Sequence, residues 1–162
     1  MEFHEIKDKV KNALNAFYKN DYFLVEKKLC ERCVVHRIAV YLENERFPGY
    51  FIDCEYNKSH LNKSNERKII SNPNGNFIDI IITKRDGNYQ NDLICFEIKR
   101  WDNYHERNKD RNNLKILTKG DRFGYSCGFY IILGESKEKT KIEVYIKGKK
   151  IDEFTLVNEN ET

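Results

Sequence analysis

Two short apolar segments, residues 77–82 and 93–98, lie on either side of a turn signal, and an acidic residue interrupts each of them. Asp79 stands within the isoleucine-rich first segment, and Glu97 follows Leu-Ile-Cys-Phe in the second, two residues before Lys99. β-Branched and aromatic residues are typical of buried strands. A carboxylate in such a strand is costly unless a cation or hydrogen bonds compensate it. The two segments therefore predict a hairpin of core strands that carries a chemical site.

The pairing of these two strands depends on the loop between them. Side chains alternate along a strand, so residues directly opposite each other share one face of the sheet. A loop centred near Asn88 places Asp79 opposite Glu97, because their numbers average to 88. A tight two-residue turn at Asp86-Gly87 pairs Asp79 with Ile94 instead. The sequence leaves both registers open, and a shared acidic site requires the longer loop.

Hydrophobic periodicity and turn residues predict the remaining elements. The expected helices span residues 4–19, 26–45 and 102–119, and the expected strands span residues 50–56, 77–85, 92–100 and 125–133, followed by an edge strand or hairpin over 142–151. A polar stretch at 57–76 separates the first two strands. This order predicts an α/β fold with a mixed β-sheet flanked by helices. We expect one domain over residues 1–157 and a disordered tail at 158–162.

The composition narrows the class of protein. Of the 162 residues, 40% are hydrophobic and 34% are charged, which is typical of a globular domain with its own core. No apolar run approaches the roughly twenty residues of a membrane span, and the N-terminus lacks the basic-then-apolar order of a signal peptide. We therefore expect a cytoplasmic protein with no membrane partner. The net charge of +3 permits a nucleic-acid partner but does not identify one.

The five cysteines are expected to be reduced thiols, because their number is odd and the chain shows no export signal. Cys30 and Cys33 form a Cys-x-x-Cys motif, but a zinc site needs four ligands. Cys54, Cys95 and Cys127 are scattered within expected strands. We favour buried structural thiols over zinc or iron–sulfur ligation.

Clustered carboxylates in an apolar hairpin are most simply compensated by a hard divalent metal, which takes oxygen ligands. We expect Asp79 and Glu97 to hold Mg²⁺, or Mn²⁺ in its place, with the Ile98 carbonyl and water completing the shell. Such a metal lowers the pKa of a bound water and neutralises charge on a scissile phosphate. Lys99, on the same face as Glu97, is expected to orient that water and to stabilise developing charge. The alternative is a solvent-exposed strand with ordinary charged side chains.

This arrangement resembles the PD-(D/E)xK nuclease superfamily, whose fold is called restriction-endonuclease-like. Asp79 matches the motif aspartate, Glu97 the second acid and Lys99 the lysine, while Ile78 replaces the motif proline. The similarity covers roughly residues 21–133. It implies a restriction-endonuclease-like core and a metal-dependent nuclease that acts on nucleic acid. The resemblance does not imply a particular substrate, and DNA is our own expectation. The alternatives are a nucleic-acid-binding or assembly subunit of the same fold that does not cleave, and an unrelated α/β protein with an accidental motif.

An acidic residue also continues the apolar face of the second expected helix. Glu31 shares a stripe with Val35, Ile38 and Leu42, at offsets of four, seven and eleven residues. The superfamily often contributes a glutamate from this helix to the metal site, and Glu31 is the position that matches. The resemblance therefore implies that Glu31 joins the catalytic and metal-binding set. The alternative is a glutamate that the helix dipole favours at the first turn, or one that pairs with Lys27 or Lys28.

Basic residues recur every four positions on the helix that follows the hairpin. Arg107, Arg111, Lys115 and Lys119 form a ridge that could track phosphates of a nucleic acid. The alternative is a solvated charged face with acidic partners on the same helix. Asp110 shares a face with the leucines of this helix, which allows it to pack near the sheet and orient a basic residue. Because the chain has little room for a separate recognition domain, we expect a homodimer or a partner protein to supply specificity.

Overall fold

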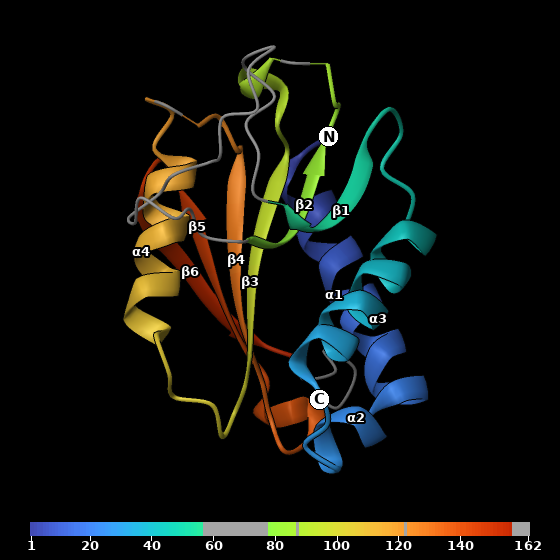
Figure 1. The fold of residues 1–162 in the computed structure, drawn as a ribbon. Helices are drawn as coiled ribbons and strands as arrows, with labels where there is room; N and C mark the ends of the chain where they lie inside the picture. Colours follow the sequence, from blue (N-terminus) through green and yellow to red (C-terminus); the bar gives the residue numbers. More distant parts are fainter. Residues whose placement is uncertain (57–77, 87, 122, 157–162) are drawn as a thin grey trace, which may run out of the picture.

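The computed structural model of the protein describes residues 1–56, 78–86, 88–121 and 123–156, which form a mixed α/β fold. A six-stranded mixed sheet is flanked by helices, as the sequence predicts (Figure 1). The helices are α1 (Phe3–Asp21), α2 (Phe23–Glu26), α3 (Glu31–Asn44) and α4 (Arg107–Thr118), with the short 3₁₀ helices η1 (Tyr89–Asn91) and η2 (Lys137–Lys139). The strands are β1 (Phe51–Tyr56), β2 (Ile78–Thr83), β3 (Ile94–Arg100), β4 (Cys127–Leu133), β5 (Lys141–Ile146) and β6 (Lys149–Thr155).

The strands follow one another across the sheet in the order of the chain, from β1 to β6. Every neighbouring pair is antiparallel except β3 and β4, which are parallel. A parallel pair needs a crossover connection, and α4 supplies it between β3 and β4. This crossover brings the first turn of α4 next to the carboxyl end of β3, where Glu97 and Lys99 lie.

Two layers of helix cover the two faces of the sheet (Figure 1). On one face α1 and α3 pack together, because apolar residues recur at helical spacing in both, and Phe17 of α1 and Ile38 of α3 are almost fully buried. On the other face Leu114 and Leu117 of α4 are fully buried against the sheet. The apolar stripe that begins at Glu31 is therefore buried, as its spacing predicts.

The register between β2 and β3 distinguishes the two loop lengths left open by the sequence. Ile80 pairs with Phe96, Ile81 with Cys95, and Ile82 with Ile94. The same register, continued by one residue, sets Asp79 opposite Glu97. The tight-turn alternative, in which Asp79 faces Ile94, is therefore wrong. The helix η1 occupies part of the longer loop.

Two predicted helices differ from the observed ones. The helix predicted over 26–45 begins only at Glu31, because Lys28 adopts a left-handed backbone (φ 53°) after the short helix α2 ends at Glu26. The helix predicted over 102–119 begins only at Arg107, and Glu106 before it is also left-handed (φ 58°). The predicted hairpin near the end of the chain is present, with Gly148 (φ 75°) in its turn. The polar stretch 57–76 and the tail 158–162 lie outside the described residues.

Candidate active site

The two acidic residues of the hairpin lie on the face of the sheet that α4 covers. Asp79 is half-buried, and its Oδ2 accepts a hydrogen bond from the backbone amide of Ile98 at 2.7 Å. Glu97 is only 3% exposed, and its Oε1 accepts a hydrogen bond from Nδ2 of Asn113 on α4 at 3.2 Å. Each carboxylate thus accepts a hydrogen bond from a neutral donor. Among the described residues, no lysine or arginine forms an ion pair with either of them.

Burial disfavours the ionised form of both carboxyl groups and so raises their pKa values. It raises the pKa of Asp79 from its ordinary value of 3.8 to about 7, although the Ile98 amide and the Lys99 ammonium oppose the shift. Burial also raises the pKa of Glu97 well above its ordinary value, and the charges of Asp79 and Asp110 add to the effect. A bound cation would stabilise the ionised form of these buried carboxyl groups, so the site favours one.

Lys99 supplies one positive charge within this acidic cluster. Its Nζ donates a hydrogen bond to Oε1 of Glu31 at 3.2 Å and lies 3.6 Å from Oδ2 of Asp110. Burial alone lowers the pKa of Lys99, but the carboxylates of Asp110, Glu31 and Asp79 outweigh burial and raise it. Lys99 therefore stays an ammonium at neutral pH and cannot serve as a general base there.

The structure brings Glu31 to the site through Lys99. The first turn of α3 places the Glu31 carboxylate between two donors, since its Oε1 binds Lys99 and its Oε2 accepts from Nδ2 of Asn103 at 2.9 Å. Arg107 fixes the turn that carries Asn103, because its Nε donates to the Asn103 carbonyl at 2.9 Å and its Nη2 to the Trp101 carbonyl at 2.8 Å. Glu31 thus positions Lys99, and its predicted role as a metal ligand stays a prediction.

The predicted basic ridge on α4 divides into two parts. Arg107 and Arg111 are held by groups of the protein, Arg107 by backbone carbonyls and Arg111 by the carboxylate of Glu143. Lys115 is exposed, and Lys119 is exposed with Asp121 2.5 Å away. The interpretation of all four residues as a phosphate-tracking surface therefore stays a prediction, and Lys115 and Lys119 are the members with solvent-exposed side chains.

The hairpin offers oxygen atoms of the type that a magnesium ion prefers as ligands. Among the described residues, no group of three or more histidine, cysteine or acidic side chains is arranged to hold a metal. Mg²⁺, however, keeps several waters and takes one or two carboxylates, and Asp79 and Glu97 face each other by register. The amide and carbonyl of one strand residue point to the same side, so the Ile98 carbonyl is directed toward β2, as its amide is. The buried Oδ2 of Asp110 also has no hydrogen-bond partner among the described residues.

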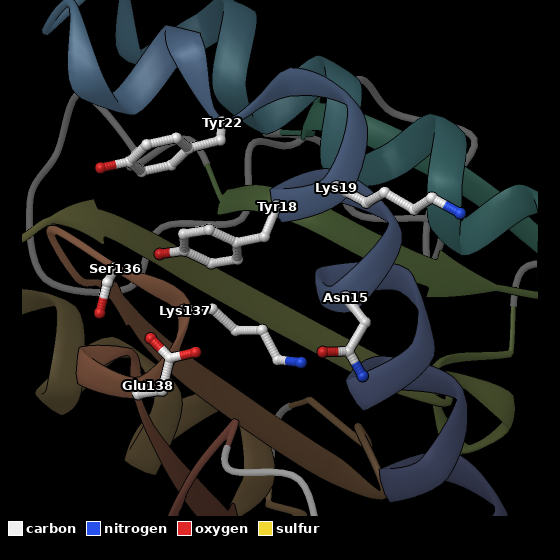
Figure 2. A pocket seen from close by; sticks show the side chains of 7 residues that line it. All are labelled: Asn15, Tyr18, Lys19, Tyr22, Ser136, Lys137 and Glu138. Atoms are coloured by element: carbon white, nitrogen blue, oxygen red, sulfur yellow. The ribbon is translucent and has the colours of Figure 1, made fainter.

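A separate hollow lies between the carboxyl-terminal part of α1 and the segment around η2 (Figure 2). It measures about 600 Å³. Tyr18 and Tyr22 stack in it with ring centroids 5.8 Å apart, and the hydroxyl of Tyr18 donates to the Gly134 carbonyl at 3.2 Å. Its lining side chains are Asn15, Tyr18, Lys19, Tyr22, Ser136, Lys137 and Glu138. The hollow is therefore distinct from the acidic site.

Comparisons with protein-family models, with curated proteins and with solved structures found no match for this chain. Within the described residues, none of the helices has the length and apolar character needed to cross a membrane. The site is therefore interpreted from its own geometry.

Three side chains of the site were not identified from the sequence. Asn113 and Asn103, which bind Glu97 and Glu31, are polar residues without a motif. The available signal was spacing, because Asn113 is three residues after Asp110 and shares its face of the helix. The structure buries Asn113 to 2% exposure. Tyr130, opposite Glu97 on β4, has a buried hydroxyl with no hydrogen-bond partner among the described residues. Its position depends on the pairing of distant strands, which the sequence does not reveal.

The metal-free protein is expected to lose stability as the pH rises from about 5 to about 8. The pKa of Asp79 is raised on folding from 3.8 to about 7, so the folded state binds more protons over this range and its stability falls with rising pH. We expect a loss of roughly 2 kcal/mol in the free energy of unfolding, and Asp79→Asn should remove much of it.

Denaturant unfolding of the parent protein and Asp79→Asn at both pH values, in EDTA, checks this expectation. Adding Mg²⁺ should restore the stability of the parent at about pH 8 more than at about pH 5, because metal binding competes with protons. A parent protein whose stability is flat or increases with pH, with no response to Mg²⁺, would contradict the burial of ionisable carboxylates at this site.

Proposed function

We propose that the protein is a metal-dependent nuclease of the PD-(D/E)xK type, with a restriction-endonuclease-like core, that hydrolyses phosphodiester bonds of DNA. One observation carries the proposal: the β2–β3 register sets Asp79 opposite Glu97, with Lys99 on the same face of β3. The arrangement of the neighbouring elements supports the proposal. Helix α4 covers the face of the sheet that carries the acids, and the first turn of α3 brings Glu31 to Lys99.

Asp79 and Glu97 would hold Mg²⁺ through carboxylate oxygens, with the Ile98 carbonyl as a third protein ligand. When bound, the metal supplies a water of lowered pKa and neutralises charge on the phosphate. The hydrogen bond from the Ile98 amide fixes one oxygen of Asp79, and that from Asn113 fixes one oxygen of Glu97. The hairpin and α4 thus preorganise both acids before a ligand arrives.

Lys99 acts as a fixed cation in this proposal. Its raised pKa keeps the proton on Nζ, so the ammonium donates hydrogen bonds to an attacking water or a phosphate oxygen and stabilises charge that develops there. Glu31 and Asp110 hold the ammonium on two sides. Preorganised charge of this kind is effective because it needs no rearrangement during the reaction.

Cleavage of labelled substrates tests the proposal. Single-stranded DNA, duplex DNA and RNA are incubated with the protein in Mg²⁺ or Mn²⁺, with EDTA as the metal-free control and Glu97→Gln as the inactive variant. We expect metal-dependent cleavage of DNA that Glu97→Gln abolishes. Binding of DNA without cleavage in either metal would favour the non-cleaving subunit, and neither binding nor cleavage would favour an accidental motif.

Asp110→Asn is expected to lower the cleavage rate about 10-fold, mainly in kcat, because the variant loses a charge that holds Lys99. The charge of Asp110 also raises the pKa of Asp79 and of Glu97, so without it these carboxyl groups ionise at lower pH and the acidic limit of activity should move to lower pH. The pH–rate profile of the variant measures this shift. Glu106→Gln, at the exposed start of the same helix, is the matched control and should leave the profile nearly unchanged. An Asp110→Asn profile that superimposes on that of the parent would show that Asp110 is structural only.

A further inference from the structure

Two of the cysteines lie together at the start of α3, where the sequence pattern alone favoured burial. Cys30 is the N-cap residue of α3 and Cys33 lies in its first turn, and both are exposed. The expectation of buried thiols is correct for Cys95 and Cys127 but wrong for this pair and for Cys54, which is also exposed. The N-cap position turns the Cys30 side chain toward the first turn, which contains Cys33.

The backbone places the Cα atoms of the two cysteines at a separation that a disulfide can span. The Cys33 amide donates to the Cys30 carbonyl at 3.0 Å, which closes a turn between the two residues. Helical geometry sets residues three apart at a Cα separation of roughly 5 Å. Disulfides in proteins join Cα atoms roughly 4.4–6.8 Å apart, so the turn needs no large rearrangement to accept one.

The surroundings of the pair differ from those of the other thiols. The backbone amides of Arg32 and Cys33 lower the pKa of the Cys30 thiol. The Cys54 residue is exposed as well, but partial desolvation of its thiol and the charges of neighbouring acidic residues raise its pKa to about 11. Cys95 and Cys127 are buried, and each donates to a backbone carbonyl. Cys30 and Cys33 are therefore two exposed thiols that lie within one helical turn of each other.

We propose that Cys30 and Cys33 form a reversible dithiol–disulfide site whose oxidant is hydrogen peroxide. The Cys30 thiolate attacks the peroxide oxygen, the O–O bond breaks, and a sulfenic acid and one water are formed after protonation. The Cys33 thiol then attacks the Cys30 sulfur, the S–O bond breaks, and a second water leaves as the disulfide forms. The pair loses two electrons and two protons, and the peroxide is reduced to two waters. A small dithiol reverses the reaction by exchange.

A disulfide between Cys30 and Cys33 would affect the neighbouring acidic site. Glu31 lies inside the short loop that the disulfide would close, and its carboxylate binds Lys99 and Asn103. Oxidation would therefore fix the backbone on both sides of the residue that positions Lys99. This consequence rests on the proposed nuclease function, whereas the disulfide itself does not, so the test uses a chemical readout.

Mass spectrometry of the full chain tests the site. Reduced protein is treated with hydrogen peroxide in metal-free buffer, and we expect the intact mass to fall by about 2 Da, with reversal by dithiothreitol. Trypsin cleaves after Arg32, between the two cysteines, so the disulfide should link peptide 29–32 to peptide 33–37. Of the five thiols, Cys54, Cys95 and Cys127 should remain available for alkylation after unfolding.

Matched serine variants distinguish the proposed pair from general oxidation. Cys33→Ser should stop at the sulfenic acid, a mass gain of about 16 Da, because the resolving thiol is missing. Cys54→Ser should form the disulfide as the parent does. The proposal is overturned if peptides 29–32 and 33–37 remain unlinked in the oxidised parent, or if Cys54 or a second chain is the main partner of Cys30.

Discussion

Replacement of Lys99 by alanine is expected to slow DNA cleavage about 100–1000-fold, which corresponds to roughly 2.7–4 kcal/mol of lost transition-state stabilisation. The reason is the loss of the ammonium that Glu31 and Asp110 hold in the acidic site. The overall fold should persist, because Lys99 lies near the end of β3 and makes polar rather than core contacts. Single-turnover cleavage of a labelled duplex in Mg²⁺ measures the effect.

Lys99→Arg is the matched variant, since it keeps the charge and changes the shape of the donor. We expect it not to restore the parent rate, because a planar guanidinium cannot occupy the compact site between Glu31 and Asp110 as an ammonium does. The thermal midpoint Tm of both variants controls for folding, and DNA binding in EDTA controls for affinity. Equal cleavage rates for Lys99→Ala and the parent would show that the catalytic assignment of Lys99 is wrong.

The hairpin could be predicted from the sequence because its signals are local. Isoleucine-rich strands bounded by turn residues identify the strands, and the period of two assigns Glu97 and Lys99 to one face. The register was left open, since it depends on whether residues 86–91 form a tight turn or a longer loop. The observed pairing of Ile80 with Phe96 decides it in favour of a shared site for Asp79 and Glu97.

The neighbours of Lys99 could be predicted only in part. Glu31 could be predicted because an acid continues a helical apolar stripe and because the resemblance implies a glutamate on this helix. Val35, one turn further along the stripe, is buried as expected. Asp110 was recognised as a residue that could pack near the sheet, but its partner could not be named, because β3 and α4 approach each other only after the crossover is made. Asn103 carries no sequence signal, since its contact with Glu31 joins residues 72 positions apart.

The basic ridge shows why spacing on a helix does not fix the role of a charge. Four basic residues at intervals of four suggested a continuous surface for phosphates. In the structure Arg111 faces the sheet, where its guanidinium lies 4.8 Å from the ring centroid of Tyr130 and binds Glu143 on β5. This partner is 32 residues away in the chain, so only the tertiary arrangement reveals it.

Arg111→Ala is therefore expected to reduce the free energy of unfolding by about 3 kcal/mol, as removal of one partner from a largely buried ion pair does. The Glu143 side chain is 9% exposed and accepts hydrogen bonds from Nε of Arg111 at 2.9 Å, from its Nη2 at 2.8 Å and from the Tyr145 hydroxyl at 2.6 Å. The arginine lowers the pKa of Glu143 against the opposing effect of burial. Without Arg111, a carboxylate would remain in an apolar region with one neutral donor.

Urea unfolding of a small set of variants tests this interpretation against a role in nucleic-acid contact. Lys115→Ala, an exposed position one turn further along α4, should change the free energy of unfolding by less than about 0.5 kcal/mol. Adding Glu143→Gln to Arg111→Ala should recover part of the lost stability, because the unpaired charge is removed, and the double-mutant cycle measures the coupling. A phosphate contact predicts the opposite pattern for Arg111→Ala: unchanged unfolding, weaker DNA binding and a shallower salt dependence. That pattern would overturn the structural assignment of Arg111 and return it to the DNA-binding ridge.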